Sequence, residues 1–207
     1  MTDTNVFVEF PKIARLSRGT VVTEKIDGTN AQIFIEDAEG KIATLPNVVP
    51  VAMQMHGRTI TRVLRAGSRN RWIDPTDDNF GFARWMFDHA NELAQLGPGR
   101  HYGEWWGSGI QRAYGLKNGD KRFSLFNVGR WRASPPPACC SIVPVLHEGD
   151  FDMAAITSCL DMLRTFGSKA APGFMQPEGV VVFHAASRTL FKKTILKDES
   201  PKGQTES

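Results

Sequence analysis

Glu24-Lys25-Ile26-Asp27-Gly28-Thr29-Asn30 is the stretch from which the fold of this chain can be worked out. The β-branched residues from Thr20 to Ile26 predict a strand that runs into the turn dipeptide Asp27-Gly28. From Asn30 to Ile35 apolar and polar residues alternate, which predicts a second strand. Asp-Gly is also a common dipeptide in plain hairpin turns. On its own, the stretch therefore indicates two antiparallel strands and nothing more specific.

The residues that follow continue the pattern of strands and turns. Residues 37–40 predict a turn and residues 41–45 a third strand, so that the chain begins with an antiparallel meander. Residues 46–71 are irregular and rich in arginine. Later strands are expected at residues 101–106, 122–128, 178–183 and 189–196, with a stiff proline loop at residues 135–137.

Two helices are expected between these strands. The first begins after Asp77 or Asp78 and ends at Gly97. Its apolar face contains Phe82, Trp85, Met86, Ala90 and Leu93. The second covers residues 151–166 and ends at Gly167, and its inward positions are Met153, Ile156, Leu160 and Leu163. The order of elements predicts an α+β domain with largely antiparallel sheets.

The composition is that of an ordinary soluble globular protein, with 207 residues and a formal net charge of +3. The chain contains no apolar run of about 18 residues, and its N-terminus lacks the order of a signal peptide. A cytoplasmic location is therefore expected. The three cysteines, Cys139, Cys140 and Cys159, match no zinc spacing and are expected to be free thiols.

Lys25 is the first candidate for chemistry, because a lysine amine can serve as a nucleophile when it is neutral. An ordinary lysine has a pKa of about 10.4, so only roughly one amine in a thousand is neutral near pH 7. The site must therefore supply burial or neighbouring cations that favour the neutral amine. Asp27, two residues further along, could orient the amine or hold a metal.

Four later segments carry functional candidates in or beside apolar strands. Glu104, between Tyr102 and Trp106, needs a polar partner if it is buried. Phe126 could stack on a ligand or simply pack in the core. Glu178 opens an apolar strand and suits either a divalent metal or a turn. Adjacent Lys192 and Lys193 must point to opposite faces of a strand, so that one faces a cleft, unless they only protect an exposed edge.

In this order, the five segments resemble the motifs of the covalent nucleotidyltransferase superfamily, which includes ATP-dependent DNA ligases, RNA ligases and mRNA capping enzymes. The resemblance extends from Lys25 to Lys193. Residues 122–128 and the short length are most similar to the RNA ligase branch. The resemblance implies an ATP-grasp-like nucleotidyltransferase (adenylation) domain at residues 1–196, with no OB-fold appended and a disordered polar tail at residues 197–207.

The resemblance also implies a role for each motif residue. Lys25 is the expected nucleophile, with Asp27 in support and Lys192 or Lys193 at the α-phosphate. Glu104 is expected to bind the ribose and Phe126 to stack on adenine. The full set of implied nucleotide contacts is Glu24, Ile26, Asn30, Arg69, Glu104, Phe126 and Glu178. The implied metal ligands are Glu178 and Asp27, and the implied contacts to a 5′-phosphate are Arg58, Arg69 and Arg71.

Two positions depart from the motifs of the family. Its last motif usually reads Lys-x-Lys, whereas Lys192 and Lys193 are adjacent here. The sequence therefore leaves open which of the two contacts the phosphate. Asn127 stands where many relatives carry aspartate, which affects a supporting contact.

The reaction implied by the resemblance uses ATP and Mg²⁺ or Mn²⁺. Lys25 takes AMP from ATP, AMP passes to a 5′-phosphate, and a 3′-hydroxyl displaces it. The implied partners are nucleic-acid ends or nicks, with RNA favoured and DNA possible, and no membrane. An accessory protein in place of a C-terminal domain, or the basic residues between Arg58 and Arg71, would then hold a weakly and salt-sensitively bound substrate.

Three other functions fit the same motifs. A minimal ATP-dependent DNA ligase shares the first step with an RNA ligase. A capping-type guanylyltransferase would load GTP instead of ATP. A non-catalytic nucleic-acid-binding protein on the same fold would form no lysyl-nucleotide adduct.

Overall fold

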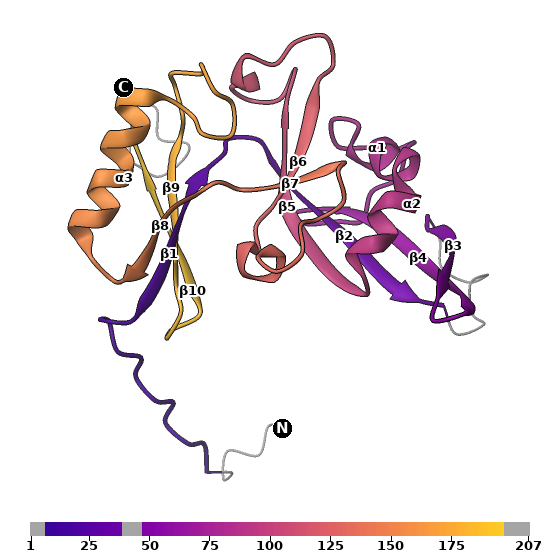
Figure 1. The fold of residues 1–207 in the computed structure, drawn as a ribbon, viewed down its shortest axis with the longest axis horizontal. Helices are drawn as coiled ribbons and strands as arrows, with labels where there is room; N and C mark the ends of the chain where they lie inside the picture. The colour runs from indigo at the N-terminus through magenta and orange to yellow at the C-terminus, as the bar shows by residue number, and fades with distance from the viewer. Residues whose placement is uncertain (1–6, 39–46, 197–207) are drawn as a thin grey trace.

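The computed structural model describes residues 7–38 and 47–196, and this part of the chain forms two lobes, each built on a sheet (Figure 1). The first lobe contains a four-stranded sheet with the order β10-β9-β1-β8, in which all neighbouring strands are antiparallel. Its strands are β1 (Gly19–Lys25), β8 (Val145–Asp150), β9 (Gly179–His184) and β10 (Thr189–Thr194). Helix α3 (Met153–Phe166) packs on this sheet through a small apolar core.

The second lobe contains a six-stranded sheet with the order β3-β4-β2-β5-β6-β7. Only β6 and β7 are parallel neighbours in it. Its strands are β2 (Thr29–Asp37), β3 (Val49–Met55), β4 (Arg58–Ser68), β5 (Gly99–Gly107), β6 (Lys121–Leu125) and β7 (Cys140–Ile142). Helices α1 (Phe82–Asp88) and α2 (Ala90–Leu93), together with the 3-10 turn η2 (Ala94–Leu96), cover one face and enclose the larger core. The prediction of an α+β chain with largely antiparallel sheets is confirmed.

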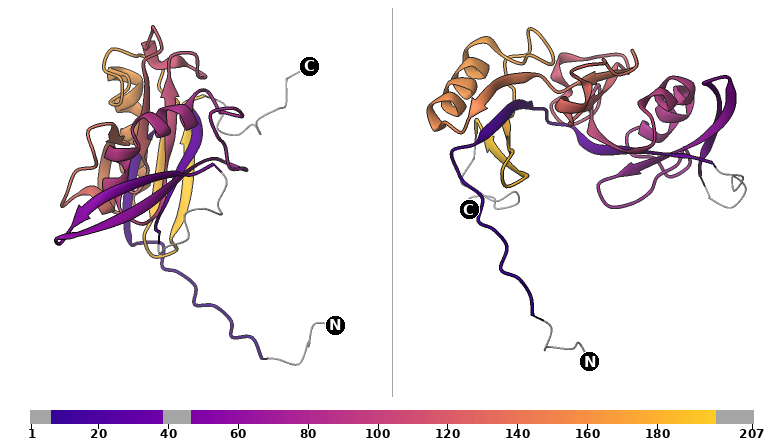
Figure 2. Two further views of the ribbon diagram at one scale, coloured as in Figure 1. Left: turned by 90° about the vertical axis from the view of Figure 1, so that its right-hand side faces the viewer. Right: turned by 60° about the horizontal axis from the view of Figure 1, so that its bottom comes forward.

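The chain passes from one lobe to the other between β1 and β2, through residues 26–28 (Figures 1 and 2). The predicted hairpin and meander are therefore wrong, because β1 and β2 pair with different strands. The partners of β1 are β8 and β9, which lie more than 100 residues later in the sequence. A third apolar cluster joins the lobes at this crossing and consists of Ile26, Trp106, Tyr114, Val143 and Ala171.

The stretch that the sequence suggested to be irregular contains two regular strands. Val49–Met55 and Arg58–Ser68 form β3 and β4, which make a hairpin at the edge of the six-stranded sheet. Their alternation is weak because Arg62, an inward position, is buried and donates to Asp37 and to the carbonyl of Ala94. β7 and β8 were not predicted either, and the expected strand at residues 41–45 lies outside the described residues.

The first predicted helix is confirmed, although it is interrupted at His89 between α1 and α2. Asp78 does accept hydrogen bonds from the amides of Ala83 and Arg84 in the first turn of α1, and Gly97 ends η2 with a positive φ. No described helix is long and apolar enough to cross a membrane.

The second predicted helix begins two residues later than expected, at Met153. Asp152 caps it by accepting from the amide of Ala154. Ile156, Leu160 and Leu163 are buried as predicted, whereas Met153 is 52% exposed because it lies in the first turn, outside the apolar stripe.

Candidate active site

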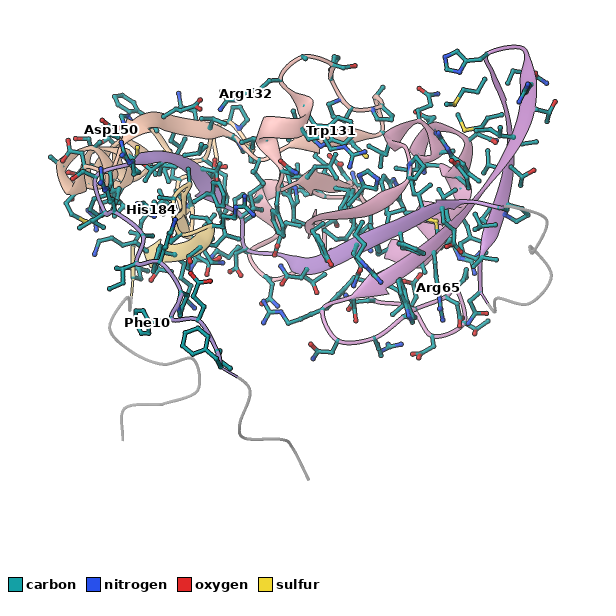
Figure 3. All side chains as sticks on the ribbon, turned by 90° about the horizontal axis from the view of Figure 1, so that it is seen from below. Phe10, Arg65, Trp131, Arg132, Asp150 and His184 are labelled. Carbon is teal, nitrogen blue, oxygen red and sulfur yellow. The ribbon has the colours of Figure 1, made fainter. Side chains whose placement is uncertain are left out.

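A cavity of about 970 Å³ lies between the two sheets, next to the crossing from β1 to β2. β1, β9 and β10 line it from the four-stranded sheet, and β2 and β5 line it from the six-stranded sheet. Residues 125–132, which follow β6 and include the 3-10 turn η4 (Val128–Trp131), line it as well. Figure 3 shows Trp131 and Arg132 of this segment near the junction of the lobes, with His184 marking one lobe and Arg65 the other.

Lys25 lies at the end of β1 and extends into this cavity, where its side chain is 20% exposed. Its Nζ is 2.5 Å from Oε2 of Glu178, whose side chain is only 6% exposed. Glu178 directly precedes β9, and the register pairs Lys25 with Gly179, so the two strands bring the charged groups together. The contact with Glu178 therefore fixes the position of the Lys25 amine inside the cavity.

Glu104 on β5 forms the opposite wall and is 7% exposed. Its carboxylate accepts from the amide of Gly28 at 3.0 Å and from Nδ2 of Asn30 at 2.9 Å. Burial raises the pKa of Glu104 to about 7, although the nearby Lys25 ammonium acts in the opposite direction. Near neutral pH, this carboxyl group can thus either accept or donate a hydrogen bond to a ligand hydroxyl.

Arg69 is connected to the same group through Asn30. Its Nε donates to Oδ1 of Asn30 at 2.9 Å, and Arg69 lines the cavity. Lys25, Asn30, Arg69, Glu104 and Glu178 are therefore brought together as the sequence motifs predicted.

Gly28 is explained by the close approach of β5 and not by the turn that the Asp27-Gly28 dipeptide suggested. A Cβ at this position would lie 2.4 Å from the carbonyl oxygen of Trp105 and 2.8 Å from Cβ of Trp106. The crossing chain is thus pressed against β5, and this contact positions the Gly28 amide to bind Glu104.

Asp27 is held by two residues that the sequence motifs did not indicate. Nε of Arg112 donates to Oδ2 of Asp27 at 2.9 Å, and Nη1 of Arg112 donates to the carbonyl of Gln176 at 2.9 Å. The amide of Asp27 donates to the hydroxyl of Tyr114 at 2.9 Å. Arg112 thereby connects the segment after Lys25 to the segment before Glu178.

The only sequence signal for this contact was the glycine-rich loop after β5. In it Gln111, Ala113 and Tyr114 all have positive φ. Such backbone conformations cost free energy and cluster at functional sites. They cannot be recognised from the sequence, because none of these three residues is glycine.

Glu24 and Ile26 both line the cavity, but their side chains are bound elsewhere. The Glu24 carboxylate is buried and accepts from the hydroxyl of Ser168 and from the amides of Lys169 and Ala170. Burial raises the pKa of Glu24, and these hydrogen bonds oppose that effect. The side chain of Ile26 belongs to the cluster that joins the lobes. Any contact of these residues with a nucleotide would therefore come mainly from their backbone.

The two adjacent lysines of β10 point to opposite faces of the sheet. Lys192 pairs with Val181 and lines the cavity, whereas Lys193 pairs with Val180, which points into the core beneath α3. This register favours Lys192 as the phosphate contact.

Phe126 is 39% exposed and lines the cavity just after β6. Its exposed ring suits stacking on a base better than core packing. The neighbouring Asn127, which stands where many relatives carry aspartate, caps η4 by accepting a hydrogen bond from the amide of Arg130.

Arg58 and Arg71 do not line the cavity. Arg58 pairs with Met55 at the hairpin end of β3 and β4, and Arg71 forms an ion pair with Asp77. Their predicted phosphate contacts have no support from these positions, because the hairpin and the loop after β4 carry them away from Lys25. Of the predicted arginines, only Arg69 remains in the candidate site.

The carboxylates of the site fit a divalent cation only in part. The described residues contain no group of three or more His, Cys, Asp or Glu side chains that could hold a metal. Asp27 is paired with Arg112 and Glu178 with Lys25, so a cation bound at either carboxylate would share it with that partner. Mg²⁺ commonly binds through one or two carboxylates together with the phosphates of a nucleotide. The site therefore suits a cation that arrives with its nucleotide.

Comparison with known proteins identifies the family of the chain. The sequence profile of the RNA ligase family matches residues 18–197. The chain therefore belongs to the RNA ligase family, the branch of the nucleotidyltransferases that its motifs indicated. No curated protein sequence matched the chain.

Solved structures of an RNA ligase from Naegleria gruberi share the fold. A lysine-to-methionine mutant with AMP and Mn has a TM-score of 0.51 and 17% sequence identity, and the match covers 86% of this chain and 50% of that chain. A lysine-to-alanine mutant with ATP and Mn has a TM-score of 0.50 and 15% identity, with the same coverage. At this identity the similarity concerns the fold alone, and the present chain spans about half the length of those proteins.

Proposed function

We propose that this chain is an ATP-dependent polynucleotide ligase that acts on RNA ends and forms a lysyl-AMP intermediate at Lys25. The observation that carries the proposal is the position of Lys25, which is paired with buried Glu178 and faces Glu104 across the cavity between the sheets. We infer that the two lobes form an ATP-grasp-like adenylation domain covering residues 1–196, and that the protein works in the cytoplasm.

The first step is an in-line displacement at the α-phosphorus of ATP. The ammonium of Lys25 loses a proton, Nζ forms a bond to phosphorus, and the bond to pyrophosphate breaks. Glu178 holds the amine in the cavity before the reaction, and Lys192 stabilises the charge that develops on the α-phosphate. Mg²⁺ or Mn²⁺ bound by Glu178 and the phosphates would neutralise further charge when present.

The other cavity residues position the nucleotide. Glu104 binds the ribose hydroxyls, Phe126 stacks on adenine, and Arg69 with Asn30 binds AMP or the incoming 5′-phosphate. In the second step an oxygen of the 5′-phosphate attacks the AMP phosphorus and the bond to Lys25 breaks. In the third step a 3′-hydroxyl attacks the activated phosphate, AMP leaves, and the strand is sealed.

Nicked duplexes made of RNA, of DNA and of both test the proposal. Each is incubated with α-labelled ATP, and a second series carries a pre-adenylylated 5′-end. We expect sealing of nicks whose reacting ends are RNA, with or without the pre-formed adenylate. Sealing of all-DNA nicks alone would instead identify a minimal DNA ligase.

Two controls separate the remaining functions. Competition between ATP and GTP distinguishes a capping-type guanylyltransferase, which would load GTP. A chain that forms no lysyl-nucleotide adduct, with Mg²⁺ or with Mn²⁺, would be a non-catalytic binding protein, and the proposal would fall.

A further inference from the structure

The sheet face that contains Glu104 continues outward along the cavity wall, which Gln32, Tyr102 and Arg100 also line. Alternate residues of a strand share a face, and β2 and β5 pair in register. Asn30 lies opposite Glu104, Gln32 opposite Tyr102, and Phe34 opposite Arg100. From Glu104 to Arg100 the distance along β5 is roughly 13 Å, at about 3.3 Å per residue. The face thus leads outward from Lys25 in three cross-strand steps.

The third step contains a stack of guanidinium groups and aromatic rings, which we call the arginine–aromatic row (Phe34, Arg65, Trp72 and Arg100). Arg65 lies opposite Phe34 on β4, and Trp72 joins from the loop after β4. Cζ of Arg65 is 4.4 Å from the Trp72 ring centre, and Cζ of Arg100 is 4.8 Å from that of Phe34 and 5.4 Å from that of Trp72. In Figure 3, Arg65 marks where this row lies on the second lobe.

The positive charge of the row is not neutralised by the described residues. Arg100 donates to the amide oxygen of Gln32, and Arg69, nearer the cavity, donates to that of Asn30. Nε of Arg65 is buried and has no hydrogen-bond partner in the described part of the chain. Other arginines do form ion pairs with carboxylates: Arg62, Arg71, Arg112, Arg122, Arg132 and Arg164. Arg65, Arg69 and Arg100 form no ion pair with a carboxylate of the described residues, and all three lie on the side of the sheet that leads to Lys25. Such a group of positive charges favours an anionic ligand.

We propose that the arginine–aromatic row binds a single-stranded segment of the polynucleotide whose end enters the active site. Unstacked bases stack on aromatic rings and on guanidinium planes, and arginines contact phosphates. Tyr102, which is 52% exposed, lies between the row and Glu104 and can carry the next base. Glu36 occupies the following position on this face of β2, so the favourable charge ends there. The inference rests on the proposed function, since it extends the same site.

Binding of a 3′-fluorescein-labelled single-stranded RNA, followed by anisotropy, tests the row. The main variant is Arg100→Glu, because Arg100 is exposed and its replacement does not disturb the core. We expect its Kd to be at least about tenfold higher than that of the wild type. The slope of log K against log salt should also become shallower by about 0.7 for the lost phosphate contact, with a further change from the reversed charge. Arg65→Gln, a second variant, should weaken binding in the same direction.

The matched control is Arg84→Glu, which makes the same charge change at an exposed position on α1, on the opposite side of the sheet. It should bind RNA within about twofold of the wild type, and melting curves confirm that each variant is folded. If Arg84→Glu and Arg100→Glu weakened RNA binding equally, the loss would reflect the net charge of the protein and not a contact with the row, and the proposal would be overturned. Unchanged binding by Arg100→Glu would overturn it as well.

The outcomes separate this inference from the proposed function. If the wild type forms lysyl-AMP while Arg100→Glu binds RNA as the wild type does, the proposed RNA contact of the row is wrong and the ligase proposal stands. If the wild type binds RNA through the row but forms no adduct with any nucleotide, the ligase proposal is wrong and the row stands. Crosslinking of 4-thiouridine RNA to the peptide that contains Trp72 gives a check that does not depend on variants.

Discussion

Single residues set the positions of the charged groups in this site. The ion pair with Glu178 fixes the Lys25 amine at the end of β1. Lys192 lies on the same face of the sheet and adds positive charge to the cavity. A phosphate group bound between Lys25 and Lys192 would contact both cations.

Lys192→Ala should slow lysyl-AMP formation by about a hundredfold, because loss of one charge-stabilising donor commonly costs 10² to 10³ in rate. Lys193→Ala should have a much smaller effect, since Lys193 points to the side of the sheet that α3 covers. Single-turnover transfer from α-labelled ATP measures both rates. A larger loss for Lys193→Ala would reverse the assignment.

Glu104→Gln should remove one contribution to the pH dependence of stability. Burial raises the pKa of Glu104 from 4.5 to about 7. Between these values the folded chain binds a proton that the unfolded chain has lost, so wild-type stability falls as the pH rises through this window. Melting of both proteins at pH 5 and pH 8 measures the effect. The wild-type midpoint should fall relative to that of the variant, and parallel curves would contradict the assignment.

At the scale of elements, the site depends on how closely β1, β2, β5 and β9 approach one another. At the crossing, the amide of Gly28 donates to the Glu104 carboxylate, and Gly28 leaves no room for a Cβ beside the carbonyl of Trp105. Arg112 adds a connection from the loop after β5 to both Asp27 and the segment before β9. Each of these contacts joins parts of the chain that are distant in sequence.

Gly28→Ala should destabilise the fold by about 1–3 kcal/mol, the usual cost of an overpacked position. Its Cβ would lie 2.4 Å from the carbonyl oxygen of Trp105, which belongs to a strand that cannot move freely. Urea unfolding measures the change in free energy. Gly19→Ala is the matched control, because nothing lies within 4 Å of a Cβ there. Equal stability of the two variants would contradict the close approach.

The elements also show what the sequence could predict and what it could not. Local patterns gave β1, β2, β5, α1 and α3, because periodicity and caps depend on neighbouring residues. The pairing of β1 with β8 and β9 could not be predicted, since it depends on contacts between distant residues. β3 and β4 were missed because their inward face contains a buried arginine, Arg62, in place of an apolar residue.

The candidate site was more predictable than the topology around it. The order of the motifs indicated Lys25, Glu104, Phe126 and Glu178, and it left Lys192 and Lys193 as alternatives. Arg112 and Tyr114 could not be predicted, because their role comes from the path of a loop with positive φ angles. Arg58 and Arg71, which were expected to contact a 5′-phosphate, do not line the cavity, because Arg58 lies at the hairpin end of β3 and β4 and Arg71 pairs with Asp77.

At the scale of the whole molecule, the cavity lies between two sheets that are joined by a small apolar cluster. A nucleotide in it would contact both lobes, with Lys25 and Lys192 on one side and Asn30 and Glu104 on the other. A ligand that bridges the lobes in this way stabilises their arrangement in addition to occupying the site.

AMP should therefore raise the midpoint of thermal unfolding. A ligand at 100 times its Kd stabilises the folded state by about 2.7 kcal/mol. AMP is used because it cannot react with Lys25, so the shift reports binding alone. GMP at the same concentration should give a smaller shift. An equal shift with both nucleotides would argue against selectivity for adenine. No shift with either nucleotide would argue against the cavity as a nucleotide-binding site.

The most direct test of the account is the transfer of label from α-labelled ATP to the protein in the presence of Mg²⁺ or Mn²⁺. The wild type should acquire an acid-labile adduct on the peptide that contains Lys25, and Lys25→Ala should acquire none. Lys117→Ala, which removes an exposed lysine after β5, should be labelled as the wild type is. A covalent label that persists in Lys25→Ala, or a wild type that is never labelled, would contradict the assignment of Lys25 as the nucleophile.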